Sequence, residues 1–156
     1  MFNRNSQTAR PVGVEAHERA VSRLRESFAA LGPDETVRLA KKTSNLFRPR
    51  ERATRGLDVE GLAGVISIDA EARTADVQGM CTYENLVDVT LQHGLMPFVV
   101  PQLRTITLGG AVTGLGIEST SFRNGLPHES VLEMDVFTGE GTIVTATPTN
   151  EHADLF

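Results

Sequence analysis

The sequence has little of several features that mark common classes of protein. It contains one cysteine, Cys81, which excludes an internal disulfide and favours a reducing compartment, the cytoplasm. Its four histidines are scattered and have no zinc-ligand spacing, so no metal site is predicted. No run of apolar residues approaches the ~20 that a membrane span needs. Residues 1–13 have no signal-peptide core, so a secretory leader is not expected either.

The charge balance argues against a nucleic-acid-binding protein. The net charge is −5 at pH 7, and such an acidic chain has no general affinity for nucleic acid or for an acidic membrane surface. With 156 residues, of which 40% are apolar and 22% charged, the chain is about the size of one soluble domain. Whether that domain forms a homo-oligomer is left open by the sequence.

Helix and strand patterns are mixed without strict alternation, which predicts an α+β fold. Residues 1–13 are polar and are expected to be flexible. Residues 14–32 carry apolar side chains at three- and four-residue steps, which predicts an amphipathic helix on the flank of the domain. Residues 82–93 have the cap and the periodicity of a second helix. Short strands are expected at residues 37–39, 64–68, 74–78, 130–137 and 142–146.

Residues 41–55 are basic, although the chain as a whole is acidic. This segment holds six of the 15 lysines and arginines. Most charge runs are solvated loops, but this one could also face phosphates, with Thr43, Ser44 and Asn45 as additional hydrogen-bond donors. The residues alone leave both interpretations open.

The rest of the chain is organised around residues 105–125, the glycine-rich stretch. It holds five of the 14 glycines and, between Arg104 and Arg123, a single charged residue, Glu118. A surface helix is not expected here, because glycine costs ~1 kcal/mol per helical position and an exposed face would carry charges. A disordered linker is not expected either, since the stretch is too apolar. The pattern predicts backbone packed closely against a partner, which is either protein backbone or a flat ligand with phosphates.

The glycine spacing does not match the common nucleotide-binding motifs. The gap from Gly109 to Gly114 is that of a Walker A loop, but Leu115 and Gly116 replace the Lys-Ser/Thr pair that binds phosphates and Mg²⁺. A Rossmann turn would need a third glycine where Ser119 stands. No serine occupies the centre of a G-x-S-x-G motif. These motifs therefore predict neither an ATP loop nor a Rossmann site nor a serine nucleophile.

Residues 101–156 nevertheless resemble the FAD-binding domain of the vanillyl-alcohol oxidase / p-cresol methylhydroxylase superfamily. The shared pieces are T-L-G-G at 107–110, G-x-G-I-E-S-x-S at 114–121, Thr147-Pro148 and the later Asp154-Leu155-Phe156. Within the superfamily the chain is most similar to the delta-24 sterol reductase branch, and FAD-linked sugar oxidases are the alternative branch. The likeness is weaker over residues 37–100 and absent from the N-terminal helix.

This resemblance implies that non-covalent FAD lies extended between two α+β subdomains, residues 33–100 and 101–156, with its pyrophosphate held by backbone N–H groups. Glu118 is expected to position the cofactor rather than to act in catalysis, and no catalytic residue is assigned. The implied cofactor contacts are Thr43, Ser44, Asn45 and Arg48 in the first subdomain, and Thr107, Gly109, Gly110, Gly114, Gly116, Ile117, Glu118, Ser119 and Ser121 in the second.

Two departures from the family's pattern concern the first phosphate loop. No glycine occurs between Gly32 and Gly56, so the loop has no residue that adopts positive φ freely. Residues 33–55 also lack the histidine or cysteine that some members use to attach flavin covalently, and Cys81 lies well beyond them. The second departure is the reason for expecting non-covalent FAD.

We therefore expect the N-terminal FAD-binding part of an FAD-dependent oxidoreductase. Such an enzyme transfers hydride between flavin and an organic small-molecule substrate, here a sterol or lipid-like molecule. A last helix is predicted at residues 151–156 with no length left to pack, so the domain is expected to be C-terminally incomplete and to lack its substrate domain. The alternatives are a non-catalytic truncated FAD or nucleotide module, and an interaction domain that docks through the 14–32 helix.

Overall fold

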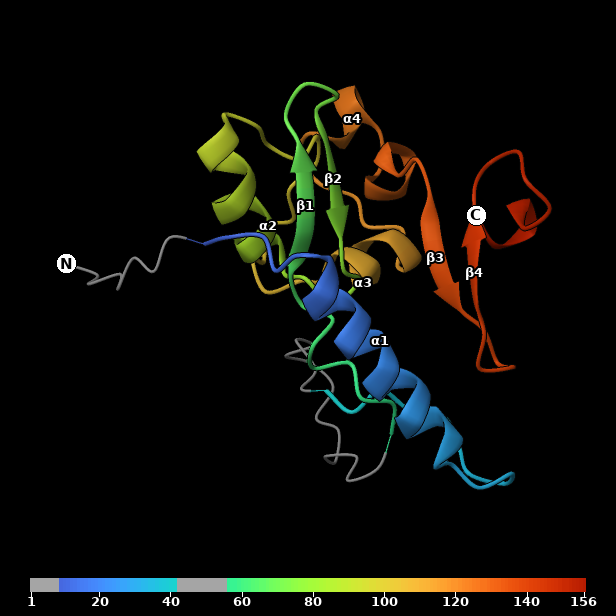
Figure 1. The fold of residues 1–156 in the computed structure, drawn as a ribbon. Coiled ribbons are helices and arrows are strands. Elements are labelled where there is room, and N and C mark those ends of the chain that lie inside the picture. Colours follow the sequence, from blue (N-terminus) through green and yellow to red (C-terminus); the bar gives the residue numbers. More distant parts are fainter. Residues whose placement is uncertain (1–8, 42–55) are drawn as a thin grey trace.

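The computed structural model describes residues 9–41 and 56–156, which form a mixture of helices and strands (Figure 1). This mixture agrees with the predicted α+β class. In the described part, the strands pair as two separate antiparallel hairpins, β1–β2 and β3–β4. The elements are α1 (Val14–Ala29), β1 (Val65–Asp69), β2 (Thr74–Val77), α2 (Tyr83–Thr90), α3 (Leu108–Thr113), α4 (Ser121–Asn124), β3 (Met134–Phe137) and β4 (Ile143–Ala146), with single 3₁₀ turns at Leu91–His93, Pro127–Ser130 and Ala153–Leu155.

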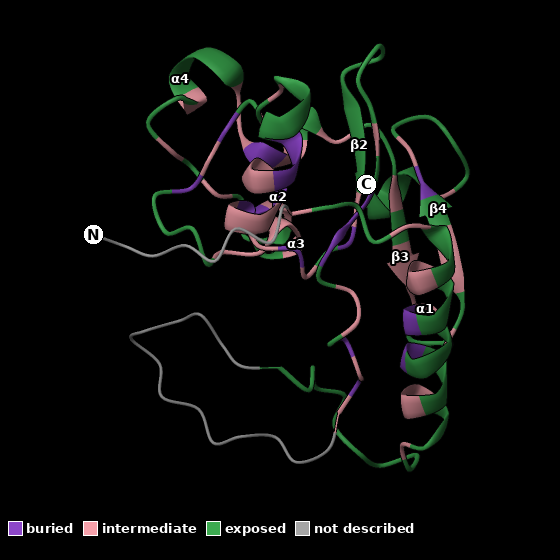
Figure 2. Ribbon diagram, turned by 60° about the vertical axis from the view of Figure 1, so that its left-hand side comes forward, coloured by how far each residue is buried: buried purple, intermediate pink, exposed green. Residues whose placement is uncertain are grey.

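Helix α1 is the predicted amphipathic helix, and one side of it is buried (Figure 2). Ala20 and Leu24 on that side are 1% and 6% exposed. The ring of Phe28 packs edge-on against Phe137 of β3, with 5.3 Å between the ring centroids. The helix ends at Ala29, earlier than the residues 14–32 expected from sequence. The helix therefore packs against the body of the protein, as predicted for a helix on the flank of the domain.

The β1–β2 hairpin is a predicted element that contains a bulge. The register shifts between Val65 and Ser67, so Ile66 is the extra residue. This shift lets two consecutive side chains, Val65 and Ile66, be buried in a strand where alternate residues would otherwise face solvent. The segment before α1 lies beside β1, because the N–H groups of Val12 and Gly13 donate to the carbonyls of Val65 and Ile66 at 2.8 and 3.2 Å.

Helix α2 begins where the sequence predicts, but it ends at Thr90, and Leu91–His93 continue as a 3₁₀ turn. The hydroxyl of Thr82 accepts a hydrogen bond from the N–H of Asn85 at 3.2 Å, which caps the first turn. Gly94 ends the following 3₁₀ turn with a φ of 69°, a conformation that favours glycine. This helix contributes Tyr83, Leu86 and Val89 to the first hydrophobic core, which also contains Val65, Cys81 and Ala111.

Two predicted strands are shorter than expected. Residues 37–39 form only an isolated bridge, between Leu39 and Leu57. The strand expected at 130–137 begins at Met134, because the pairing stops where Met134 meets Ala146. Pro148, two residues beyond Ala146, has no N–H with which to continue the ladder. Ser130, the first residue of the predicted strand, is instead the last residue of the 3₁₀ turn at Pro127–Ser130, and residues 131–133 are irregular.

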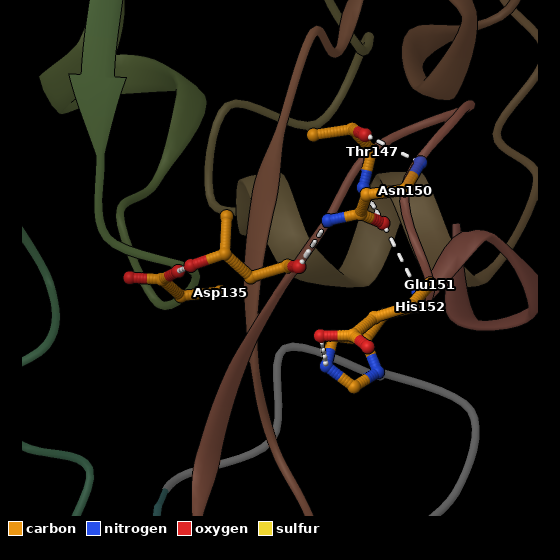
Figure 3. Close-up of polar contacts among 6 residues, drawn as sticks. Asp135, Thr147, Asn150, Glu151 and His152 are labelled. Carbon is orange, nitrogen blue, oxygen red and sulfur yellow. Dashed lines mark hydrogen bonds and ion pairs between the residues drawn. The ribbon is translucent and has the colours of Figure 1, made fainter.

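The helix expected at residues 151–156 is also wrong, since only a 3₁₀ turn forms there. Figure 3 shows how Asn150 competes with a helical first turn: its side-chain oxygen accepts from the N–H groups of Thr147 and His152, both at 3.1 Å. Its side-chain amide donates to the carbonyl of Thr145 at 2.7 Å, which ties the turn to β4. Such local side-chain bonds favour a turn over a short helix.

Candidate functional site

The glycine-rich stretch lies against the segment that leads into α2. The N–H groups of Leu108 and Gly109 donate to the carbonyls of Cys81 and Gly79, both at 2.8 Å, and the N–H of Tyr83 donates to the carbonyl of Ile106 at 3.0 Å. These bonds join the two segments in an antiparallel arrangement, and they hold the glycine-rich stretch against the first hydrophobic core. The close packing predicted for this stretch is therefore present, and here the partner is protein backbone.

Gly109 is a position in this stretch where the backbone contact itself requires glycine. A Cβ built on Gly109 would lie 2.8 Å from the carbonyl oxygen of Gly79, closer than real Cβ atoms approach. The oxygen belongs to the backbone and accepts the hydrogen bond from Gly109, so it has no freedom to turn away. The reverse is not true, because a Cβ on Gly79 would meet nothing within 4 Å.

Part of the stretch is helical, which the sequence did not predict. Residues Leu108–Thr113 form α3, whose first turn is capped by the hydroxyl of Thr107, a hydrogen-bond acceptor for the N–H of Gly110 at 3.2 Å. Ala111 is buried, so one side of the helix packs on the core, while Gly110 is exposed. The cap and the buried contact offset the cost of two glycines, which an estimate from propensity alone does not include.

The loop after α3 fixes the direction of Glu118. The hydroxyl of Ser121 accepts from the N–H of Glu118 at 3.0 Å, and the carbonyl of Glu118 accepts from the N–H of Ser121 at 2.9 Å. The Glu118 carboxylate accepts from the N–H of Gln102 at 3.3 Å. The loop turns at Leu115, which adopts a φ of 49° in the left-handed region. Glu118 is thus held by both its backbone and its side chain.

These elements surround a cleft of about 260 Å³. Clefts that bind small molecules are typically ~300–1,000 Å³, so this one has room for part of a dinucleotide. A cation and a carboxylate are both present in its lining, and its remaining polar group is a hydroxyl. The lining residues are Lys41, Pro101, Ile106, Thr107, Gly110, Ala111, Gly116 and Glu118.

The residues that the sequence proposed for cofactor contact fall into four groups. Four of them line the cleft: Thr107, Gly110, Gly116 and Glu118. Three others shape its surroundings, because Gly109 packs on Gly79, Gly114 follows the last residue of α3, and Ser121 bonds to Glu118. Ile117 and Ser119 are exposed and do not line the cleft, with Ile117 76% exposed. Thr43, Ser44, Asn45 and Arg48 lie outside the described residues.

Sequence reasoning missed Lys41 as a site residue. Lys41 is the first residue of the basic segment 41–55, and that position was the available signal. Its place beside Thr107 and Gly110 depends on a contact between segments far apart in the chain. The apolar lining residues Pro101, Ile106 and Ala111 gave no signal of their own, since they resemble ordinary core residues in sequence.

Two buried groups beneath the cleft stay neutral at pH 7. Burial, and to a lesser degree the nearby carboxylate of Glu118, raises the pKa of Tyr83 to about 12. Burial raises the pKa of the Cys81 thiol to about 11, against a smaller lowering effect of hydrogen bonds from Asn85 and Leu86. Because Cys81 is 0% exposed, its role is that of a small core residue rather than a nucleophile.

The raised pKa of Cys81 gives a pH dependence that can be measured. In the unfolded chain the thiol ionises near pH 9, whereas in the folded protein it stays neutral until about pH 11. The unfolded state therefore gains stability as pH rises through this interval. We expect the free energy of unfolding to fall by about 2 kcal/mol more for the wild type than for Cys81→Ala between pH 9 and 11, in urea titrations. Equal losses of unfolding free energy in the wild type and in Cys81→Ala would contradict a raised pKa of the Cys81 thiol.

Neither a metal site nor a membrane-spanning helix is found in the described part of the chain. No group of three or more histidine, cysteine, aspartate or glutamate side chains is placed to hold a metal ion among residues 9–41 and 56–156. None of the helices in those ranges combines the length and apolar character needed to cross a membrane.

Comparison with known proteins places the cleft inside a matched domain. A family model described as an FAD binding domain matches residues 34–147. This range begins after α1 and contains the glycine-rich stretch and all eight residues that line the cleft.

Individual relatives match part of the chain. The Delta(24)-sterol reductase of Pisum sativum is 32% identical over 100 residues, which are 64% of this chain and 18% of that protein. Cytokinin dehydrogenase 7 of Oryza sativa subsp. japonica is 35% identical over 104 residues, or 64% of this chain and 20% of that protein. The Delta(24)-sterol reductase of Arabidopsis thaliana is 30% identical over 100 residues. The chain spans about a fifth of the length of these relatives.

Proposed function

Because this chain belongs to the family of FAD binding domains, whose model matches residues 34–147, we propose that its cleft holds the diphosphate part of FAD in an FAD-dependent oxidoreductase. The resemblance noted from the sequence is confirmed at the level of the family and of the sterol reductase relatives. The cytokinin dehydrogenases are further relatives that the sequence motifs did not suggest.

The observation that carries this proposal is the composition of the cleft. Thr107, Gly110 and Gly116 come from the glycine-rich stretch, and Lys41 comes from the start of the basic segment. A cation, a hydroxyl and a helical glycine without a side chain suit an anionic group that must approach the backbone closely. The small volume fits a diphosphate and part of the adjoining sugar rather than the whole cofactor.

The chain's own residues would bind and orient the cofactor. Glu118, held by Gln102 and Ser121, is placed to accept hydrogen bonds from the hydroxyl groups of a sugar. Ile106 and Ala111 give the cleft an apolar wall. Bound FAD would supply hydride transfer to or from an organic substrate, and the protein's part is orientation and electrostatics. Cys81 is fully buried and does not line the cleft, which supports non-covalent binding.

The substrate class is proposed from the relatives. A sterol or similar lipid follows from the matches named Delta(24)-sterol reductase, whereas the matches named cytokinin dehydrogenase favour a different small organic molecule. Hydride transfer is proposed for whole proteins of this family, since the chain spans about a fifth of the relatives' length. The division into subdomains at residue 100 stays a prediction.

A visible absorption spectrum of the purified chain tests the proposal. We expect a two-band flavin spectrum, and we expect the yellow colour to move into the supernatant when the protein is denatured by heat or acid. Flavin that stays with the precipitate would contradict non-covalent binding. A colourless protein that also fails to take up added FAD would contradict the proposed function, and it would leave the interaction-domain alternative.

A further inference from the structure

Lys41 is the single cation among the described residues that line the cleft. Its backbone is fixed to the rest of the protein, because the N–H of Ala40 donates to the carbonyl of Leu57 at 2.9 Å and the N–H of Leu57 donates to the carbonyl of Arg38 at 2.7 Å. Leu57 is 7% exposed and belongs to the second hydrophobic core. The position of Lys41 beside the cleft is therefore set by a buried contact.

The ammonium group of Lys41 contacts the segment before α2. Its Nζ donates to the sulfur of Met80 at 3.5 Å. A thioether is a weak acceptor, so this bond is easily exchanged for one to an anion. Met80 adjoins Gly79 and Cys81, the residues whose carbonyls hold the glycine-rich stretch. The cation thus lies next to the backbone that positions α3.

Neighbouring arginines are less suited to this role. Arg104 is the nearest cation in sequence to the cleft residues of the glycine-rich stretch, and it forms an ion pair with Glu84 at 3.0 Å. Arg123 lies in α4, and it is not among the residues that line the cleft. Lys41 is therefore the described cation that an anion in the cleft would meet.

The two charges of the cleft also favour one orientation of a bound ligand. Lys41 would attract an anion, whereas Glu118 would repel one and accept hydrogen bonds from hydroxyl groups. The two side chains do not form an ion pair with each other within the described structure, so neither charge is neutralised by the other. A ligand with a diphosphate next to a hydroxyl-bearing sugar matches this arrangement.

From this arrangement we infer that Lys41 binds the diphosphate of the cofactor and makes the site selective for FAD over flavins that lack phosphate. The inference rests on the proposed function and deepens it, because it assigns phosphate recognition to one described side chain. The lysine acts as a point charge, whereas the surrounding backbone supplies shape. Removal of the charge should therefore lower the affinity for every ligand that carries the diphosphate. The affinity for ligands without the diphosphate should not change.

The experiment compares three ligands and four proteins by isothermal titration calorimetry at low salt. The ligands are FAD, ADP as the diphosphate half, and riboflavin as the flavin without phosphate. The proteins are the wild type, Lys41→Met, which keeps the aliphatic stem, Lys41→Arg, which keeps the charge, and Arg38→Met. Arg38 is an exposed residue three positions earlier that does not line the cleft, so its replacement controls for the change in net charge.

We expect Lys41→Met to lower the affinity for FAD and for ADP about tenfold, because a charge-assisted contact to phosphate is lost. Riboflavin affinity should stay within about twofold, and Lys41→Arg should keep most of the FAD affinity. The wild-type affinity for ADP should also decrease more steeply with salt than that of Lys41→Met. Circular dichroism would establish that all four proteins are folded.

Four results would overturn the inference, and the last of them would also overturn the proposed function. Equal losses for riboflavin and ADP would mean that Lys41 acts on the fold of the site rather than on phosphate. An equal loss in Arg38→Met would mean that net charge alone is responsible. Unchanged FAD and ADP affinity in Lys41→Met would refute the contact while the proposed function stands. A wild-type protein that binds neither FAD nor riboflavin would refute the proposed function, and the inference with it.

Discussion

Replacement of Gly109 by alanine is expected to lower the free energy of unfolding by about 2 kcal/mol and to prevent flavin retention. The added Cβ would lie 2.8 Å from the carbonyl oxygen of Gly79, so the two backbone segments must move apart. This separation weakens the 2.8 Å hydrogen bond from Gly109 to Gly79 and disturbs the start of α3. An alanine in a helix gains ~1 kcal/mol over glycine, which offsets only part of the overpacking cost.

Gly79→Ala is the matched control for this prediction. The two glycines touch each other, yet a Cβ on Gly79 would meet nothing within 4 Å. Alanine at Gly79 should therefore change the free energy of unfolding by less than about 0.5 kcal/mol and leave flavin binding intact. Urea unfolding followed by circular dichroism measures both variants. Similar losses in both would show that the antiparallel contact is not packed as described.

Gly110→Glu is expected to lower FAD affinity by at least a hundredfold, while the protein stays folded. The residue is exposed, and the nearest atom to an added Cβ is the Thr107 hydroxyl at 2.9 Å, a side chain that also lines the cleft. A glutamate three residues after a threonine cap forms a capping box, so the helix should tolerate it. Its carboxylate would lie near the proposed diphosphate site, where a like charge costs about 2–3 kcal/mol at ~6 Å separation.

Gly110→Gln separates the effect of charge from the effect of size. The two side chains have nearly the same shape, so any additional loss in the glutamate variant reports electrostatic repulsion. We expect the glutamine variant to bind FAD roughly 30-fold more tightly than the glutamate variant in fluorescence titrations. Equal affinities would place the diphosphate elsewhere, and wild-type affinity in both would exclude the cleft as the cofactor site.

Much of the fold could be predicted because its signals are local. The cap at Thr82, the glycine that ends the next turn and the alternating strand residues act within a few positions of one another. Each depends on short-range hydrogen bonds or on one-sided burial, which sequence periodicity reports. The prediction of a helix at 151–156 was wrong because of another local signal. The side chain of Asn150 forms local hydrogen bonds that compete with a helix.

The candidate site could be predicted only in part. Thr107, Gly110, Gly116 and Glu118 were proposed from the resemblance in one continuous stretch, and all four line the cleft. Ile117 and Ser119 belong to the same stretch but are exposed, because the turn at Leu115 and the bonds of Ser121 to Glu118 set which side chains face inward. A linear motif does not show which of its side chains face inward. Contact of any of these residues with FAD stays a prediction.

By itself, the sequence determined the α+β class, the family, and the need for glycine where the chain is charge-poor. The tertiary structure decided what that glycine-rich stretch packs against. Gly109 meets the backbone of Gly79, and Lys41 is brought beside Thr107 and Gly110 across more than 60 positions of chain. The physical reason is that composition and periodicity report each segment's own preferences. A close backbone approach or a cation beside a cleft depends on how two distant segments pack.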